Sequence, residues 1–261
     1  MIDFHAHIFP DHIAGKSIPY LSELCSMDPF TDGMQKGLLH SMNQAGITCS
    51  VILPVVTAPR QFDSVNEFAV QFLEGTFISF GGIHPDQDNY KERLRWIKAQ
   101  GLKGIKFHPD YQYTYFNDIR YKRMISYASE LDLIVVTHAG SDPSSPQDIH
   151  CTPKMVEEVL DEVRPTKLVL AHMGGNLLFD EVEERLVGRD VYFDTAYVLD
   201  KMNPEQFVRM VRNHGSEKIL FATDSPWGGQ KEFVACFQQL PFTSVEQRQI
   251  LDENAKRLLQ L

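Results

Sequence analysis

Six of the ten histidines in this sequence stand where a short apolar segment ends, and a lysine and an aspartate occupy similar positions. Imidazole nitrogens and carboxylate oxygens bind Zn²⁺ and other divalent transition metals. A bound ion of this kind polarises a carbonyl group and lowers the pKa of a water molecule, which a neighbouring base can then deprotonate. The pattern therefore indicates metal-assisted chemistry. The residues concerned are His5, His7, His84, Lys106, His108, His138, His172 and Asp224.

The first two histidines share one face of a strand, because side chains alternate along an extended backbone. His5 and His7 are two residues apart, and we expect Asp3 to point inward with them. The same alternation directs Lys106 and His108 inward. A single buried histidine more often makes a structural hydrogen bond, so the interpretation depends on convergence. The residues expected to face outward are Ile2, Phe4, Ala6, Ile105 and Phe107.

The elements that must position these side chains are short apolar segments that alternate with longer amphipathic ones. Eight such pairs predict an α/β fold, a single (β/α)₈ TIM barrel in one domain over residues 1–261, with its active site at the carboxyl ends of the strands. The alternative is an open doubly wound sheet, which favours a glycine-rich loop after the first strand, where this chain has histidines. The expected strands are 2–7, 50–56, 77–83, 104–107, 133–138, 167–172, 191–194 and 219–224.

Apolar residues at three- and four-residue spacing predict helices over 90–99 and 121–131. Two capping boxes, in which a hydroxyl and a carboxylate satisfy free backbone N–H groups, are expected to begin helices at Ser64 and Thr243. The remaining histidines lie away from the strand ends, and we expect them in solvent. These are His12, His40, His150 and His214.

Charge and composition exclude several classes of partner. The net charge of −10 makes nucleic acid an unsuitable partner, because binding it depends on neutralising phosphates. No apolar run reaches the length of about 20 residues that spans a bilayer, so no membrane association is expected. The four cysteines form no CxxC pair. With no room for a signal peptide before the first strand, we expect a cytoplasmic protein, and a homodimer is one possibility.

Several ordered segments resemble the amidohydrolase superfamily, and in particular its amidohydrolase-2 branch of metal-dependent hydrolases and decarboxylases. The resemblance runs from near the first residue to near the last, so it covers the whole chain. The segments are Ile2-Asp-Phe-His-Ala-His, Gly82-Ile-His-Pro, Gly104-Ile-Lys-Phe-His-Pro, Thr137-His-Ala-Gly, Leu170-Ala-His-Met-Gly-Gly, Phe221-Ala-Thr-Asp-Ser-Pro-Trp and Glu253-Asn-Ala-Lys-Arg-Leu-Leu.

The resemblance implies one divalent metal ion per chain, which we expect to be zinc, and catalytic roles for Asp224 and His172. It also leaves open a second ion, for which Lys106 would be the bridge and His172 a ligand. The fold alone does not decide the metal count. The implied ligands of the single ion are His5, His7, His138 and Asp224.

The expected substrate is a small organic molecule, and three readings of the function remain open. The first is hydrolysis of an amide, lactone or ester bond by a metal-activated water. The second is non-oxidative decarboxylation of an aromatic or unsaturated acid with the same metal. The third is a barrel that binds a ligand without catalysis. The side chains expected to touch the substrate are Arg60, His108, Tyr113 and Trp227.

Overall fold

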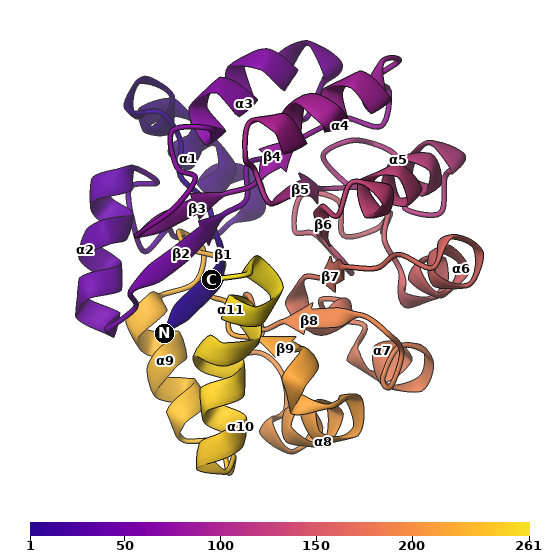
Figure 1. Cartoon of the computed structure of the whole chain (residues 1–261). Coiled ribbons are helices and arrows are strands. Elements are labelled where there is room, and N and C mark those ends of the chain that lie inside the picture. The colour runs from indigo at the N-terminus through magenta and orange to yellow at the C-terminus, as the bar shows by residue number, and fades with distance from the viewer.

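The computed structural model describes residues 1–261 and shows a closed barrel of parallel strands surrounded by helices (Figure 1). Two sheets, of order β1-β2-β3 and β4-β5-β6-β7-β8-β9, make up the barrel wall. β3 and β4 together occupy the single strand expected over 77–83, so the expected count of eight barrel strands is confirmed. The strands are β1 Ile2–Ala6, β2 Cys49–Ile52, β3 Phe77–Ser79, β4 Gly81–Gly82, β5 Gly104–Phe107, β6 Ile134–Thr137, β7 Leu168–Leu170, β8 Tyr192–Asp194 and β9 Ile219–Leu220.

The barrel closes where the segment after β9 runs beside β1. Phe4 N–H donates to the carbonyl of Phe221 at 2.9 Å, and Asp224 N–H donates to the carbonyl of His5 at 2.9 Å. Closure removes the exposed sheet edges that an open sheet would leave. The doubly wound alternative is therefore excluded.

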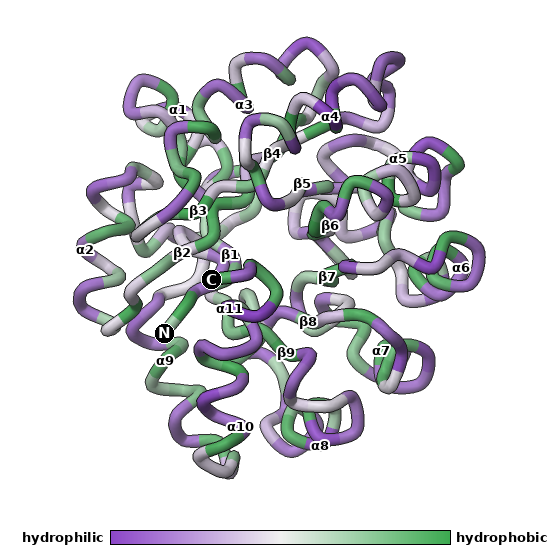
Figure 2. The backbone as a smooth tube through the Cα atoms, in the orientation of Figure 1, coloured by the Kyte–Doolittle hydropathy of each residue, from purple (hydrophilic) through white to green (hydrophobic).

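The helices follow the strands around the barrel, and green and purple alternate along them, as expected of amphipathic helices (Figure 2). Thr243 and Glu246 form the expected capping box. The one expected at Ser64 is wrong, because α3 begins earlier and the Ser64 hydroxyl donates to the Gln61 carbonyl. The helices are α1 Asp11–Cys25, α2 Gln35–Ala45, α3 Phe62–Ala69, α4 Tyr90–Ala99, α5 Ile119–Glu130, α6 Pro153–Val163, α7 Phe179–Arg185, α8 Pro204–His214, α9 Gln230–Gln238, α10 Ser244–Arg248 and α11 Asn254–Leu259.

Two apolar layers hold the fold together. The larger cluster contains 47 buried residues and lies between the strands and the helices, where Phe107 packs edge-on against Tyr121 of α5. The smaller cluster contains 16 buried residues and fills the inside of the barrel. Leu258 and Leu259 of α11 belong to this inner cluster, so the last helix closes the end of the barrel at which β1 begins (Figure 1).

The side-chain alternation expected for β1 is wrong in its first half. Ile2 and Phe4 belong to the inner cluster, whereas Asp3 points outward to Thr223 and to Gln230 of α9. Between Asp3 and Ala6 the register against β2 gains one residue, which is a β-bulge. The extra residue shifts the alternation, so Ala6 faces the helices and the following histidine faces inward.

No helix in the structure is long and apolar enough to cross a membrane. All four cysteines are free thiols.

Candidate active site and metal centre

Three of the four expected ligands converge at the carboxyl ends of β1 and β9. His7 Nε2 lies 3.1 Å from Asp224 Oδ1, and His5 Nε2 lies 3.2 Å from His7 Nε2 and 3.3 Å from the same carboxylate oxygen. Ligands about 2.1 Å from a tetrahedral ion are separated by about 3.4 Å, so these spacings match the edges of a coordination shell. The donor set of two imidazoles and one carboxylate fits a divalent transition metal.

The other nitrogen of each histidine is held by an acceptor. His5 Nδ1 lies 2.8 Å from Asp194 Oδ2, and His7 Nδ1 lies 2.8 Å from the carbonyl of Leu53. Both Nδ1 atoms therefore carry the proton, and the lone pairs of both Nε2 atoms point into the space between His5, His7 and Asp224. This is the arrangement of a metal-binding histidine pair.

Asp194 at the end of β8 organises the centre and was not among the expected site residues. The carboxylate binds His5 Nδ1, and its second oxygen accepts the backbone N–H groups of His172 at 2.9 Å and Ala196 at 3.1 Å. Desolvation by burial raises its pKa, against the opposing effects of His172 and Lys106. The sequence signal was present, since Asp194 ends an expected strand as Asp224 does.

Asp224 and Lys106 provide the charges of the centre. Burial alone would raise the pKa of the Asp224 carboxyl, but the imidazoles of His5, His7 and His172 outweigh it and hold that pKa well below its ordinary value. Lys106 Nζ lies 3.1 Å from His5 Nε2, and its side chain is buried. Desolvation lowers the pKa of this ammonium to about 8, although Asp194 and Asp224 oppose the shift.

The fourth expected ligand, His138, lies beside these residues but turns away from them. His138 Nδ1 lies 2.9 Å from His172 Nε2, and its Nε2 points toward Asp110 and Asp142. Burial lowers the pKa of both His138 and His172 to about 4, so both imidazoles are neutral. That His138 binds the same ion as His5, His7 and Asp224, which we call the first group, stays a prediction.

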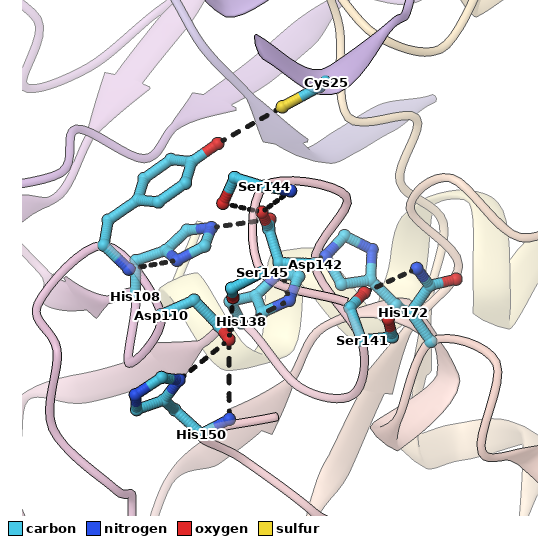
Figure 3. Close-up of polar contacts among 12 residues, drawn as sticks. Cys25, His108, Asp110, His138, Ser141, Asp142, Ser144, Ser145, His150 and His172 are labelled. Carbon is cyan, nitrogen blue, oxygen red and sulfur yellow. Dashed lines mark hydrogen bonds and ion pairs between the residues drawn. The ribbon is translucent and has the colours of Figure 1, made fainter. Parts of the chain in front are cut away.

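A second group of potential ligands contains His108, His138 and Asp142 (Figure 3). The rings of His108 and His138 stack with their centroids 4.3 Å apart, and Tyr111 stacks on the other face of His108 at 3.9 Å. His150, expected in solvent, is buried and binds the Asp110 carboxylate with its Nδ1 at 3.2 Å. The expectation for His214 is wrong in the same way, because that ring packs against Phe193.

A cavity of about 530 Å³ opens above the first group, large enough for a small organic molecule. His5, His7, Lys106 and Asp224 line its inner end. Much of the remaining wall is apolar and comes from α1, from α3 and from the loops after β1 and β2. It includes Phe9, Ile13, Leu21, Val55, Val65 and Phe68.

Two of the four expected substrate contacts line this cavity and two do not. His108 and Trp227 are in its wall. Arg60 is exposed in a short 3₁₀ turn and is not part of the lining, and its neighbour Gln61 takes that place. Tyr113 is 86% exposed, while Tyr111 reaches the cavity instead.

The closed parallel barrel carries a histidine–aspartate group of potential metal ligands at its carboxyl end, which is where enzymes of the TIM-barrel class have their active sites. The sequence matches the amidohydrolase family Amidohydro_2 over residues 2–261. The chain therefore belongs to the amidohydrolase family, and the resemblance found in the sequence is confirmed. No curated protein matched the sequence.

Solved structures share the fold at low sequence identity. A 2,6-dihydroxybenzoate decarboxylase in complex with 2,6-dihydroxybenzoate has a TM-score of 0.73 at 17% identity, covering 100% of this chain and 99% of that one. A dihydroxybenzoic acid decarboxylase from Polaromonas sp. JS666 with bound manganese gives 0.72 at 16%, covering 100% and 96%. A probable 2-pyrone-4,6-dicarboxylic acid hydrolase from Acinetobacter baumannii gives 0.66 at 15%, covering 100% and 99%. At these identities the likeness establishes the fold.

Proposed function

We propose that this protein is a metal-dependent decarboxylase of a small aromatic or unsaturated monocarboxylic acid. Hydrolysis, which the sequence favoured first, becomes the second candidate. The observation that carries the proposal is the distribution of charge in the cavity. Lys106 is the only lysine or arginine in its lining, it is buried next to the histidine–aspartate group, and much of the outer wall is apolar. A substrate with one carboxylate at the inner end and an apolar body fits that distribution.

The residues that would hold the metal are His5, His7 and Asp224, with His138 as the fourth ligand that family membership implies. Their donors suit Zn²⁺, the expected ion, and equally Mn²⁺, which the decarboxylase from Polaromonas contains. When bound, the ion would supply a Lewis acid that draws the substrate carboxylate to the inner end of the cavity.

The chain's own residues then account for the rest of the reaction. With a pKa of about 8, Lys106 is mostly protonated at neutral pH and can pair with the carboxylate. The apolar wall keeps water from that carboxylate, which favours loss of CO₂ because the negative charge then spreads into the organic ring. The carbon that loses CO₂ must take up one proton. Asp224 is ionised and His172 is neutral, so the protonated Lys106 is the group in the lining that can donate it. Asp224 and His172 can then pass a proton from water back to Lys106.

Hydrolysis of a lactone, ester or amide is supported by one specific observation. Asp224 and His172, the same two groups, can also accept a proton from an attacking water, and the 2-pyrone-4,6-dicarboxylic acid hydrolase shares the fold. The substrate named for that hydrolase carries two carboxylates, however, and this cavity offers a single ammonium group. A monocarboxylic acid therefore fits the cavity better than a dicarboxylic lactone.

The deciding experiment incubates the metal-loaded protein with aromatic monocarboxylic acids labelled with ¹³C in the carboxyl group, and measures labelled CO₂. We expect release that disappears in Asp224→Asn and falls strongly in Lys106→Met. Lys98→Met, on the exposed surface of α4, is the matched control and should retain full activity. Uptake of ¹⁸O from water into the carboxylic acid released from an ester or lactone, with no CO₂ from any acid, would establish hydrolysis instead. No turnover of either kind, with binding unchanged in Asp224→Asn, would leave a non-catalytic binding barrel.

A further inference from the structure

We propose that the outer part of the cavity, between α1 and α3, binds an uncharged apolar chain of several carbon atoms that the substrate carries in addition to its carboxylate. We call this part of the cavity the apolar arm. That the carboxylate lies at the inner end rests on the proposed function, whereas the preference of the arm rests on its own wall. The arm is lined by Phe9, Ile13, Leu21, Val55, Val65 and Phe68.

The cavity is larger than an acid with a single unsubstituted ring requires. Its volume of about 530 Å³ lies in the range of pockets that hold drug-sized ligands. Benzoate is much smaller than such ligands, so it would occupy the inner end beside Lys106 and leave water against the apolar wall of the arm. Contact between water and apolar surface is unfavourable, and a ligand that reaches into the arm removes it.

α1 presents an apolar stripe to the arm. Ile13, Ser17, Tyr20 and Leu21 all line the cavity, and their three- and four-residue spacing places them on one face of the helix. Ile13 is 40% exposed and Tyr20 is 64% exposed, so the protein itself does not cover them. Large apolar side chains that stay uncovered beside a cavity are typical of a ligand-binding surface.

α3 faces the arm from its other side. Val65 and Phe68 line the cavity three residues apart on this helix, and both are only partly buried. α1 and α3 lie on the same side of the barrel (Figure 1). A chain between the two helices would therefore contact apolar side chains of both.

Most polar groups of the arm already have partners within the protein. The hydroxyl and the backbone N–H of Thr57 both donate to Gln61 Oε1, at 2.9 and 2.8 Å. The Ser64 hydroxyl donates to the Gln61 carbonyl at 3.2 Å. None of the residues that α1 and α3 contribute to the lining is charged. A polar or charged group of a ligand would lose its hydration here and find few partners, whereas an apolar chain gains by leaving water.

The opposite side of the cavity does not suit an apolar chain. There the loops after β5, β6 and β7 contribute His108, Asp142 and Asn176 to the wall. Asn176 Oδ1 is buried and has no hydrogen-bond partner within the protein. An apolar chain on this side would cover polar groups without satisfying them, which is costly. The chain is therefore directed toward α1 and α3.

The test measures the affinity of the zinc-loaded protein for benzoate, 3-butylbenzoate and 4-butylbenzoate by isothermal titration calorimetry. Each buried methylene raises affinity about fourfold, so the better butyl acid should bind on the order of 100-fold more tightly than benzoate. Ser17→Trp and Ser64→Trp fill the arm from α1 and α3, and each should reduce this ratio to about tenfold or less.

Lys16→Trp is the matched control, because Lys16 is exposed on α1 and lies outside the lining, and it should keep the wild-type ratio. Thermal unfolding establishes that each variant is folded, and one folded variant of Ser17 or Ser64 is enough for the test. Equal affinities of the wild type for benzoate and both butyl acids would overturn the arm. A preference for a butyl acid that survives in both variants would overturn it as well, because the chain would then lie elsewhere.

A neutral probe separates the arm from the proposed function. 4-Butylbenzyl alcohol carries the same chain and ring but no carboxylate. Binding of this alcohol that disappears in Ser17→Trp and Ser64→Trp, with no CO₂ released from any acid, would support the arm and count against decarboxylation. Release of CO₂ from aromatic acids, with no gain in affinity from the butyl group, would support decarboxylation and overturn the arm. No binding of the butyl acids or of the alcohol would also overturn it.

Discussion

Replacing Asp194 by asparagine should weaken metal binding although Asp194 touches no ion. The carboxylate accepts three hydrogen bonds, from His5 Nδ1 and from the backbone N–H groups of His172 and Ala196. An amide has one oxygen and one NH₂ group, so it cannot replace both carboxylate oxygens. If the oxygen faces His5, the NH₂ group opposes two backbone donors. If the NH₂ group faces His5, the histidine proton must move to Nε2, the atom that would bind the ion.

Either orientation has a measurable cost. Moving the proton onto Nε2 should weaken metal binding about 10- to 100-fold, which corresponds to about 1.4–2.8 kcal/mol. Leaving two buried donors unpaired should instead lower the free energy of unfolding by about 1–3 kcal/mol for each donor. The choice of orientation decides which quantity changes more, so both must be measured.

The assay is competition for Zn²⁺ between the protein and a coloured chelator, together with urea unfolding of the metal-free form. Asp190→Asn is the matched control, because Asp190 lies just before the same strand, is 96% exposed and pairs only with Lys218. We expect the control to be unchanged in both measurements. A folded Asp194→Asn variant with wild-type zinc affinity and wild-type stability would refute the reasoning.

Three further predictions concern the stability of the fold. Gly140→Ala should lower the free energy of unfolding by about 3 kcal/mol or more, because Gly140 has φ +86° and a Cβ there would lie 2.0 Å from the backbone nitrogen of Asn176. Gly188→Ala is the control, since Gly188 has φ +84° but open space around it, and it should lower the free energy of unfolding by only about 1 kcal/mol. Urea titrations would measure both changes. Phe4→Ala should cost about 3–5 kcal/mol, since it empties space inside the barrel next to Phe80, and a loss below about 1 kcal/mol would contradict the inner position of Phe4. Desolvation lowers the pKa of His214, so the unfolded chain takes up a proton first as the pH falls, and stability should decrease below about pH 6.5. The difference in unfolding free energy between pH 7.5 and 5.5 should therefore be smaller in His214→Gln than in the wild type, and an equal difference would exclude a contribution from this histidine.

The barrel could be predicted from the sequence because its strands are buried on both sides. Segments such as 133–136 are continuous runs of aliphatic residues without the polar positions of an amphipathic helix. Their alternation with amphipathic segments indicates parallel strands with helical crossovers. The potential ligands at the strand ends were predictable because the carboxyl ends of the strands all lie at one end of the barrel, which brings their side chains together. His5, His7 and Asp224 therefore meet as expected.

Residues in loops could not be placed in this way. Asp110 and Asp142 lie two and four residues beyond strand-end histidines, and nothing in their spacing shows that their free oxygens face the same ring. The aromatic run after β5 shows the same limit. The sequence analysis placed Tyr113 against the substrate, but the turn, in which Tyr113 has φ +48°, exposes that side chain, and Tyr111, two residues earlier, is mostly buried.

The bulge in β1 explains why the site and the barrel floor can share one strand. A regular strand that places Phe4 inside would turn both His5 and His7 outward, because alternate residues face opposite sides. The extra residue between Asp3 and Ala6 resets the alternation. Residues before it then fill the apolar floor, and residues after it face the metal centre. Asp3 stabilises this arrangement from outside, since its carboxylate accepts the backbone N–H groups of both His5 and Thr223 and thereby joins the bulge to the segment that carries Asp224.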